Sequence, residues 1–368
     1  MSRSKHHPRW PAVASKTILF AAIALLLAGC AARITPAPPS PTTPTDKLIL
    51  YSWVDYMPQP VLDAFTAETG VEVVVRTYAS QEEAVAAIRS AAVDFDVAVI
   101  SNEKLPALIA EGRFAPLDRA AIPNFINISP NFRDLIFDPG NRYSAPYLWG
   151  TTGLLVRTDL VAAPVTRWQD LWDARYAGKI AARPLATELL TVALASLGYS
   201  HHSENPVELE AALHHLLALK PALRFVDIEV EEGLAPLLEG EVVLMVGWSG
   251  EALIARQANP NIEYVLPQEG AIAWVDNFVV AADSANRRRA EQFIDFMLRP
   301  SISAQIVEAY YYPSANEAAQ QYVDPTLAAD PLLFPAAEDA ARLNFYQSLS
   351  AEGSALYDAI WQRFLEAP

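Results

Sequence analysis

The chain is poor in cysteine and in positive charge. Its 368 residues include one cysteine, which excludes a disulfide framework and a metal site built on cysteine ligands. Lysine and arginine number 27 against 43 acidic residues, so the formal net charge is −16. Because phosphates are contacted by a basic face, this balance argues against a nucleic-acid-binding protein. An acidic surface is compatible with a cationic ligand, although acidity also serves solubility.

The sequence also lacks the short motifs of common enzyme classes. It has no G-x-S-x-G elbow, no H-E-x-x-H zinc motif, no P-loop and no G-x-G-x-x-G turn. Histidines come as three adjacent pairs, and adjacent residues such as His214 and His215 point about 100° apart on a helix, which disfavours shared metal ligation. We therefore expect no metal and no cofactor. The sequence does not exclude a catalytic pair of carboxylates, because acidic residues are abundant in this chain.

What remains is a chain able to fold around a sizeable core. Hydrophobic residues make up 52% and charged residues 19%, values outside the range of disordered proteins. A length of 368 residues suggests two domains or one large protein with two lobes.

The first 29 residues read as an export signal. Basic residues precede the 13-residue apolar run TILFAAIALLLAG at 17–29, which is too short to span a hydrocarbon core of about 30 Å. The run continues into LAGC, which resembles the lipobox of bacterial lipoproteins and implies acylation at Cys30. Residues 30–46 then hold five prolines and no glycine, a composition typical of an extended tether.

Strand and helix patterns alternate through the rest of the chain. Expected strands lie at 48–53, 71–78, 95–100, 143–158, 179–184, 241–250 and 273–281. Expected helices lie at 58–68, after Ser80, and at 104–110, 166–173, 185–197 and 206–219, with mostly helix from Arg287 onward. This order predicts β-α units and a largely parallel sheet, whose ligands bind at the carboxyl ends of the strands.

Aromatic residues next to acids or at strand ends are the most distinctive feature. They occur in the three segments YSWVDY, GWSGE and AWVD. Such rings cover methylene groups and attract a positive charge, while acids pair with it, so the pattern suits an alkylammonium ligand. Each tryptophan taken alone is as compatible with core packing; Trp168 and Trp172, four residues apart, are expected in a core, and Trp149 beside a hinge.

Ten collinear segments between residues 47 and 350 resemble the spermidine/putrescine-binding proteins of ABC importers. They are YSWVDYMP, FTAETGVEV, FDVAVIS, YSAPYLWGTTGLLV, RWQDLWDARYAGKI, LASLGYS, GWSGEALIARQ, PQEGAIAWVDN, FMLRPSISAQI and YPSAN. The resemblance implies a two-lobed α/β fold of the type II periplasmic-binding-protein kind. Each lobe would be a mixed, mostly parallel sheet flanked by helices, with a hinge between the lobes. The expected lobes are 47–150 with 277–320, and 151–276 with 321–368.

The resemblance also implies a ligand site. The matching positions are Trp53, Tyr56, Ser101, Glu188, Trp248, Glu251, Trp274, Asp276, Tyr312 and Gln347. In the family, the residue matching Glu188 holds a terminal amine, the one matching Asp276 an inner or second amine, and the one matching Glu251 serves the putrescine-type members.

Three positions depart from the family pattern. Val54 replaces a hydroxyl residue, Glu103 a tyrosine, and Leu185 a second terminal-amine acid. Glu103 is expected as a solvated surface residue, with the alternative that its side chain turns into the cleft and adds a further acid to the site. With Glu188 alone at one end and an apolar wall at Val54, the site favours a diamine slightly over spermidine.

The resulting hypothesis is a monomeric, lipid-anchored binding protein outside the cytoplasmic membrane. Its expected partners are a polyamine, an ABC permease and, through the lipid, the membrane. Two alternatives stay open: a binding protein that reports a polyamine or another small cation to a sensor, and a carboxylate-based hydrolase.

Overall fold

The computed structural model describes residues 46–334 and 343–367. The expected signal peptide, Cys30 and nearly all of the tether lie outside the described residues. In the described part, no helix combines the length and the apolar character that crossing a membrane requires.

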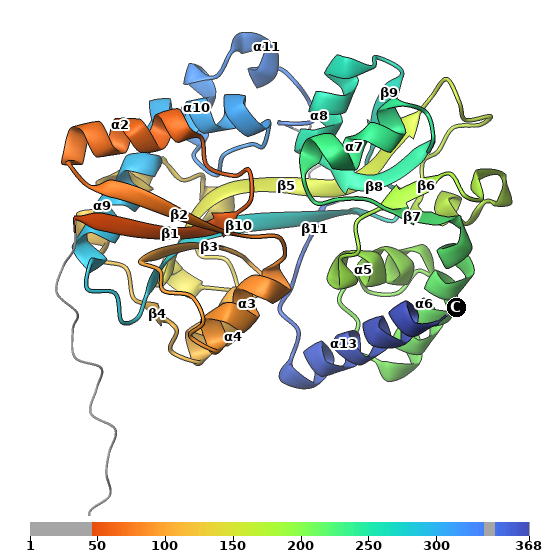
Figure 1. Cartoon of the computed structure of the whole chain (residues 1–368), viewed down its shortest axis with the longest axis horizontal. Helices are drawn as coiled ribbons and strands as arrows, with labels where there is room; N and C mark the ends of the chain where they lie inside the picture. The colour runs from red at the N-terminus through yellow and green to blue at the C-terminus, as the bar shows by residue number, and fades with distance from the viewer. Residues whose placement is uncertain (1–45, 335–342, 368) are drawn as a thin grey trace, which may run out of the picture. The chain divides into compact units, whose positions relative to one another are not determined.

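Eleven described strands form one mixed sheet, with helices on both of its faces (Figure 1). The strands are β1 (Lys47–Trp53), β2 (Glu72–Tyr78), β3 (Val97–Ser101), β4 (Phe114–Ala115), β5 (Ser144–Arg157), β6 (Ile180–Ala182), β7 (Leu223–Phe225), β8 (Leu244–Trp248), β9 (Ile262–Val265), β10 (Ala271–Ala281) and β11 (Leu343–Phe345). Their order is β2-β1-β3-β10-β5-β8-β6-β7, with β4 and β11 on β10 and β9 on β5. A mixed α/β sheet is the fold class that the sequence predicts.

Two long antiparallel strands run through the middle of this sheet. β5 has 14 residues and β10 has 11, and Gly150 pairs with Trp274 near their centres. Parallel pairs lie to either side, β2-β1-β3 at one end and β8-β6-β7 at the other. The register of β10 against β5 shifts between Val275 and Asn277, so an irregularity falls at Asp276.

Helices cover the sheet ends in four groups (Figure 1). At one end α2 (Gln59–Thr69), α9 (Arg287–Met297) and α10 (Pro300–Tyr310) lie on one face, and α3 (Gln81–Arg89) and α4 (Leu105–Ala110) on the other. At the other end α7 (Val230–Leu238) and α8 (Ser249–Ala258) lie opposite α5 (Ala186–Ser196), α6 (Pro206–Leu219) and α13 (Ala351–Glu366). The short α11 (Pro325–Ala328) follows α10.

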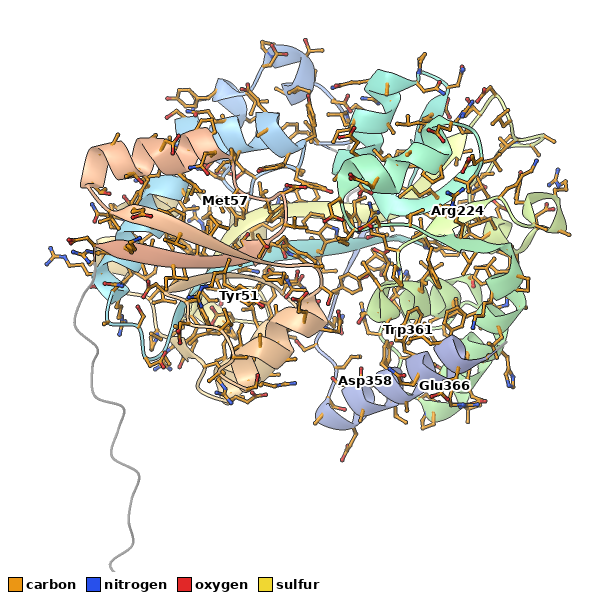
Figure 2. All side chains as sticks on the ribbon, viewed as in Figure 1. Tyr51, Met57, Arg224, Asp358, Trp361 and Glu366 are labelled. Atoms are coloured by element: carbon orange, nitrogen blue, oxygen red, sulfur yellow. The ribbon has the colours of Figure 1, made fainter. Side chains whose placement is uncertain are left out.

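Clusters of buried hydrophobic side chains lie on both faces at each end of the sheet. Figure 2 shows the described side chains on the ribbon. At the first end, Leu50 and Val99 are buried on one face and Ile100 on the other. At the second end, Ile180 is buried under α5 and Met245 under α8. Burial on both faces explains why these strands read as continuous hydrophobic runs. The division into two lobes at the boundaries given above stays a prediction.

Local signals located most elements, with informative differences. Gly70, at φ 74°, ends α2 as expected, and the Ser80 hydroxyl caps α3 by accepting from the Glu83 N–H at 3.1 Å. The segment 166–173 contains a 3₁₀ helix, Trp168–Trp172, rather than an α-helix. Helix α8 begins immediately after β8 with no turn residue between them, so the strand pattern concealed its start.

Candidate ligand-binding cleft

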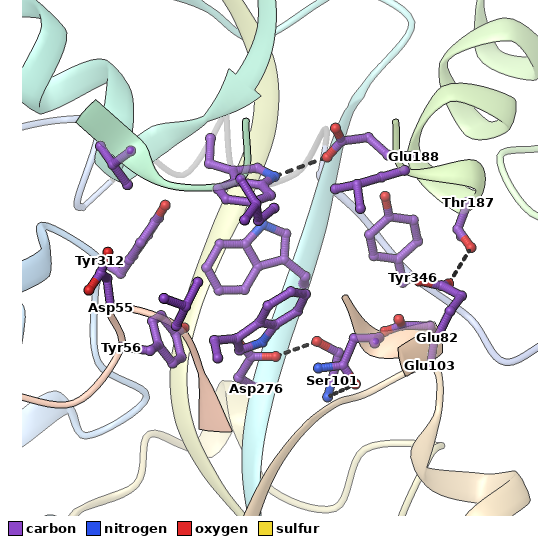
Figure 3. Close-up of a pocket in the computed structure, with 18 of the residues that line it drawn as sticks. Asp55, Tyr56, Glu82, Ser101, Glu103, Thr187, Glu188, Asp276, Tyr312 and Tyr346 are labelled. Carbon is purple, nitrogen blue, oxygen red and sulfur yellow. Dashed lines mark hydrogen bonds between the residues drawn. The ribbon is translucent and has the colours of Figure 1, made fainter. Parts of the chain in front are cut away.

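A cleft opens where β1, β3 and β8 end and where α3, α5 and α7 begin (Figure 3). Its cavity volume is about 130 Å³. Six aromatic residues line it: Trp53, Tyr56, Trp248, Trp274, Tyr312 and Tyr346. Six acids line it as well: Asp55, Glu82, Glu103, Glu188, Glu229 and Asp276. No lysine, arginine or histidine is among the described residues that line this cleft.

Asp276 lies at the irregularity in β10, opposite Ser101 of β3. Its side chain is buried, and the Ser101 hydroxyl donates a hydrogen bond to its carboxylate. Burial raises the pKa of Asp276 to about 6, while Ser101 and the nearby Tyr56 and Trp53 oppose that shift. The strand irregularity therefore presents an acid to the cleft, and no cationic side chain among the described lining residues compensates its burial.

Glu188 occupies the first turn of α5 and is also buried. One carboxylate oxygen, Oε2, accepts from the Thr152 hydroxyl at 3.1 Å and from the Trp248 indole N–H at 3.0 Å. The other, Oε1, is buried without a hydrogen-bond partner in the described part of the chain. Burial raises the pKa of Glu188, and Trp248 and Arg183 partly oppose the shift. An oxygen of this kind is ready for a donor supplied by a ligand.

Two glycines let aromatic rings approach the backbone closely. A Cβ at Gly150 would lie 2.4 Å from Cζ2 of Trp274, and one at Gly250 would lie 2.6 Å from Cε1 of Tyr312. The rings of Trp274 and Tyr312 meet edge-on, with centroids 5.1 Å apart. Positions 150 and 250 therefore require glycine for the aromatic wall to take this shape.

Eight of the ten expected ligand residues line this one cleft. They are Trp53, Tyr56, Ser101, Glu188, Trp248, Trp274, Asp276 and Tyr312. The other two are placed elsewhere. Gln347 is exposed and lines a neighbouring cavity. Glu251 is fully buried outside the cleft, where its carboxylate accepts from the Arg183 guanidinium. The expectation that Glu251 offers its charge to the ligand is therefore corrected, because its carboxylate already forms a buried ion pair with Arg183.

The three departures from the family pattern all face the cleft. Val54 and Leu185 form apolar parts of its wall. Glu103 also lines it and is only partly exposed, which corrects the expectation of a solvated surface residue. Its Oε2 is buried without a hydrogen-bond partner in the described chain, and burial raises its pKa to about 7, with Lys104 opposing.

Sequence reasoning missed several lining residues. Tyr346, which follows strand β11, lines the cleft instead of its neighbour Gln347. Figure 3 shows its side chain among the lining residues. Glu82 accepts from the Lys104 ammonium at 3.0 Å and from the Thr187 hydroxyl at 3.5 Å, a contact that joins α3 to the start of α5. The only sequence signal at Glu82 is that it is an acid in the first turn of α3, which does not indicate a ligand site.

Comparison with known proteins yields a consistent set of matches. The family model for bacterial extracellular solute-binding proteins matches residues 61–335. The spermidine/putrescine-binding periplasmic protein of Escherichia coli K12 is 35% identical over 318 residues, covering 86% of this chain and 90% of that protein.

Solved structures agree. A spermidine/putrescine ABC transporter substrate-binding protein from Streptococcus pneumoniae aligns with a TM-score of 0.74 and 32% identity, covering 87% of this chain and 99% of its own. A lipoprotein of Treponema pallidum aligns with a TM-score of 0.77 and 25% identity, covering 86% of this chain and 99% of its own.

Proposed function

This chain belongs to the bacterial extracellular solute-binding proteins, and from that premise we propose that its cleft captures a polyamine for delivery to an ABC importer. One observation carries the proposal: six acids and six aromatic rings line the cleft, and no basic side chain is among its described lining residues. A polyamine pairs ammonium groups, which acids neutralise, with methylenes, which rings cover.

Charge compensation is the source of affinity in this proposal. Asp276 and Glu188 are buried, and burial raises the pKa of both carboxyls, so each anion is unfavourable while the cleft is empty. A ligand ammonium supplies the missing positive charge and donates to the open Oε1 of Glu188. The indoles of Trp53, Trp248 and Trp274 would cover the intervening methylenes. An indole face that also meets an ammonium group would add a desolvated cation–π contact of about 2 kcal/mol.

The position of Glu103 bears on ligand length. The sequence favours a diamine because it offers reliable acids at two places. Glu103 adds a third acid with an open oxygen at the cleft edge shared with the neighbouring cavity. We therefore propose a polyamine with two or three ammonium groups, putrescine or spermidine, as the ligand.

Delivery requires a partner and a location. We propose that the protein acts as a monomer with two lobes that close over the amine and then dock on an ABC permease. Acylation of Cys30 and the proline-rich tether would keep it at the membrane surface while leaving the cleft free. The signal-like segment with its LAGC motif supports this anchor.

Replacing Asp276 by Asn removes the central negative charge with little change in shape. Because truncating one partner of a buried charge pair costs about 2–5 kcal/mol, putrescine should bind roughly 30- to 4000-fold more weakly in calorimetry. The matched control is Asp283→Asn, the same charge change at an exposed position just beyond β10, which should bind like the wild type. An Asp276→Asn variant within threefold of the wild type contradicts the assignment of this site.

Polyamine affinity should rise with pH between 5 and 8. The ligand amines stay protonated over this range, whereas Asp276, with a pKa of about 6, and Glu103, with a pKa of about 7, gain charge as pH rises. Binding at pH 5 should be roughly tenfold weaker than at pH 8 from Asp276 alone. Glu103→Gln should flatten the change near pH 7 and keep the one near pH 6. A pH-independent affinity in the wild type rules out these acids as amine partners.

Cys30→Ala should separate anchoring from binding. The acylation site precedes the globular part, so the variant should bind putrescine with wild-type affinity yet leave the membrane fraction for the soluble one. Fractionation of expressing cells followed by calorimetry on the released protein measures both properties. A variant that still sediments with membranes contradicts acylation at Cys30.

A further inference from the structure

A buried ion pair lies directly behind one wall of the cleft. Arg183, just after β6, is 1% exposed, and Glu251, in the first turn of α8, is 0% exposed. The Arg183 Nη1 donates to Glu251 Oε2 at 3.0 Å, and Nη2 donates to Oε1. A Cβ at Gly233 of α7 would lie 2.6 Å from Nη2, so that helix leaves space for the guanidinium. Neither residue lines the cleft.

The pair is nevertheless in contact with residues that do. The guanidinium carbon of Arg183 lies 4.4 Å from the ring centroid of Trp248. Glu251 Oε2 also accepts from the Trp248 backbone N–H at 3.2 Å, and the Trp248 indole donates to Glu188. The positive charge of Arg183 favours the ionised form of Glu188, whose pKa it lowers against the effect of burial. Arg183 thus acts on one aromatic wall and one acid of the cleft.

We propose that Arg183 is a positioning residue that cancels the charge of Glu251, and that the pair sets ligand affinity through Trp248 and Glu188 without touching the amine. This inference rests on the proposed polyamine function. It differs from a direct role for Glu251, in which the carboxylate would pair with an ammonium group of the ligand.

The two roles predict opposite behaviour when charges are removed. Loss of the Glu251 charge alone leaves Arg183 uncompensated beside Trp248 and Glu188, and an uncompensated cation behind the cleft wall repels a ligand ammonium. Loss of both charges returns the wall to neutrality. If Glu251 instead contacted the amine, removing Arg183 as well would restore nothing.

The test compares a single and a double variant with the wild type by calorimetry, with putrescine at pH 8. We expect Glu251→Gln to bind roughly tenfold or more weakly. The affinity of the double variant Arg183→Met/Glu251→Gln should return to within about threefold of the wild-type value. Such a recovery from the single variant is larger than the usual error of additivity. A purely structural role predicts the opposite, a double variant at least as impaired as the single one. A double variant as weak as Glu251→Gln overturns the inference.

Breaking a buried pair can prevent folding, so a charge-conserving variant provides an independent arm. Arg183→Lys/Glu251→Asp keeps both charges but shortens the acid by one methylene. Near-wild-type affinity supports action through charge. A tenfold loss, in a variant that thermal unfolding shows to be folded, means that the two charges do not suffice and overturns the inference. Wild-type protein that binds neither putrescine nor spermidine refutes the proposed function instead, so the two failures are distinguishable.

Discussion

The burial of carboxylates without a cation of their own is the constraint on which this cleft depends. Asp276 and Glu188 are both taken out of water, and no basic side chain of the described cleft lining faces them. Such an arrangement is unfavourable in the empty protein. It is tolerated because neighbouring donors share the charge, Ser101 for Asp276 and both Thr152 and Trp248 for Glu188, and because Arg183 behind the wall favours ionised Glu188. What the donors leave uncompensated is the driving force available to a cationic ligand.

The two long central strands hold this arrangement in place. β5 and β10 pass from one end of the sheet to the other, so their middle residues lie between the hydrophobic clusters of the two ends. The irregularity at Asp276 and the glycine at position 150 both fall there, one presenting an acid and the other admitting the indole of Trp274. Acid and ring are therefore fixed by backbone geometry, which lowers the ordering cost of binding.

Much of the fold was predictable because its signals are local, and most of the site was predictable because ten segments of the chain resemble a family with a ligand site at the matching positions. Buried strands read as hydrophobic runs, Gly70 ends its helix, and Trp53, Ser101 and Trp248 reach the cleft because each ends a strand. The pairing of Glu251 could not be predicted from neighbouring residues. Its partner Arg183 is 68 positions away in the sequence and is brought to it by the pairing of β6 with β8. The sequence also did not show that Tyr346 rather than Gln347 lines the cleft, because a shift of one residue reverses the direction of the side chain next to a strand.

The central claim is that charge complementarity, rather than apolar burial, selects the ligand. Calorimetry at pH 8 comparing putrescine, spermidine and 1,4-butanediol tests this most directly, because the diol keeps the four methylenes and replaces each ammonium by a neutral hydroxyl. The account predicts tight binding of at least one of the two amines and no detectable binding of the diol. Diol binding comparable to that of putrescine, or binding of none of the three, would contradict it.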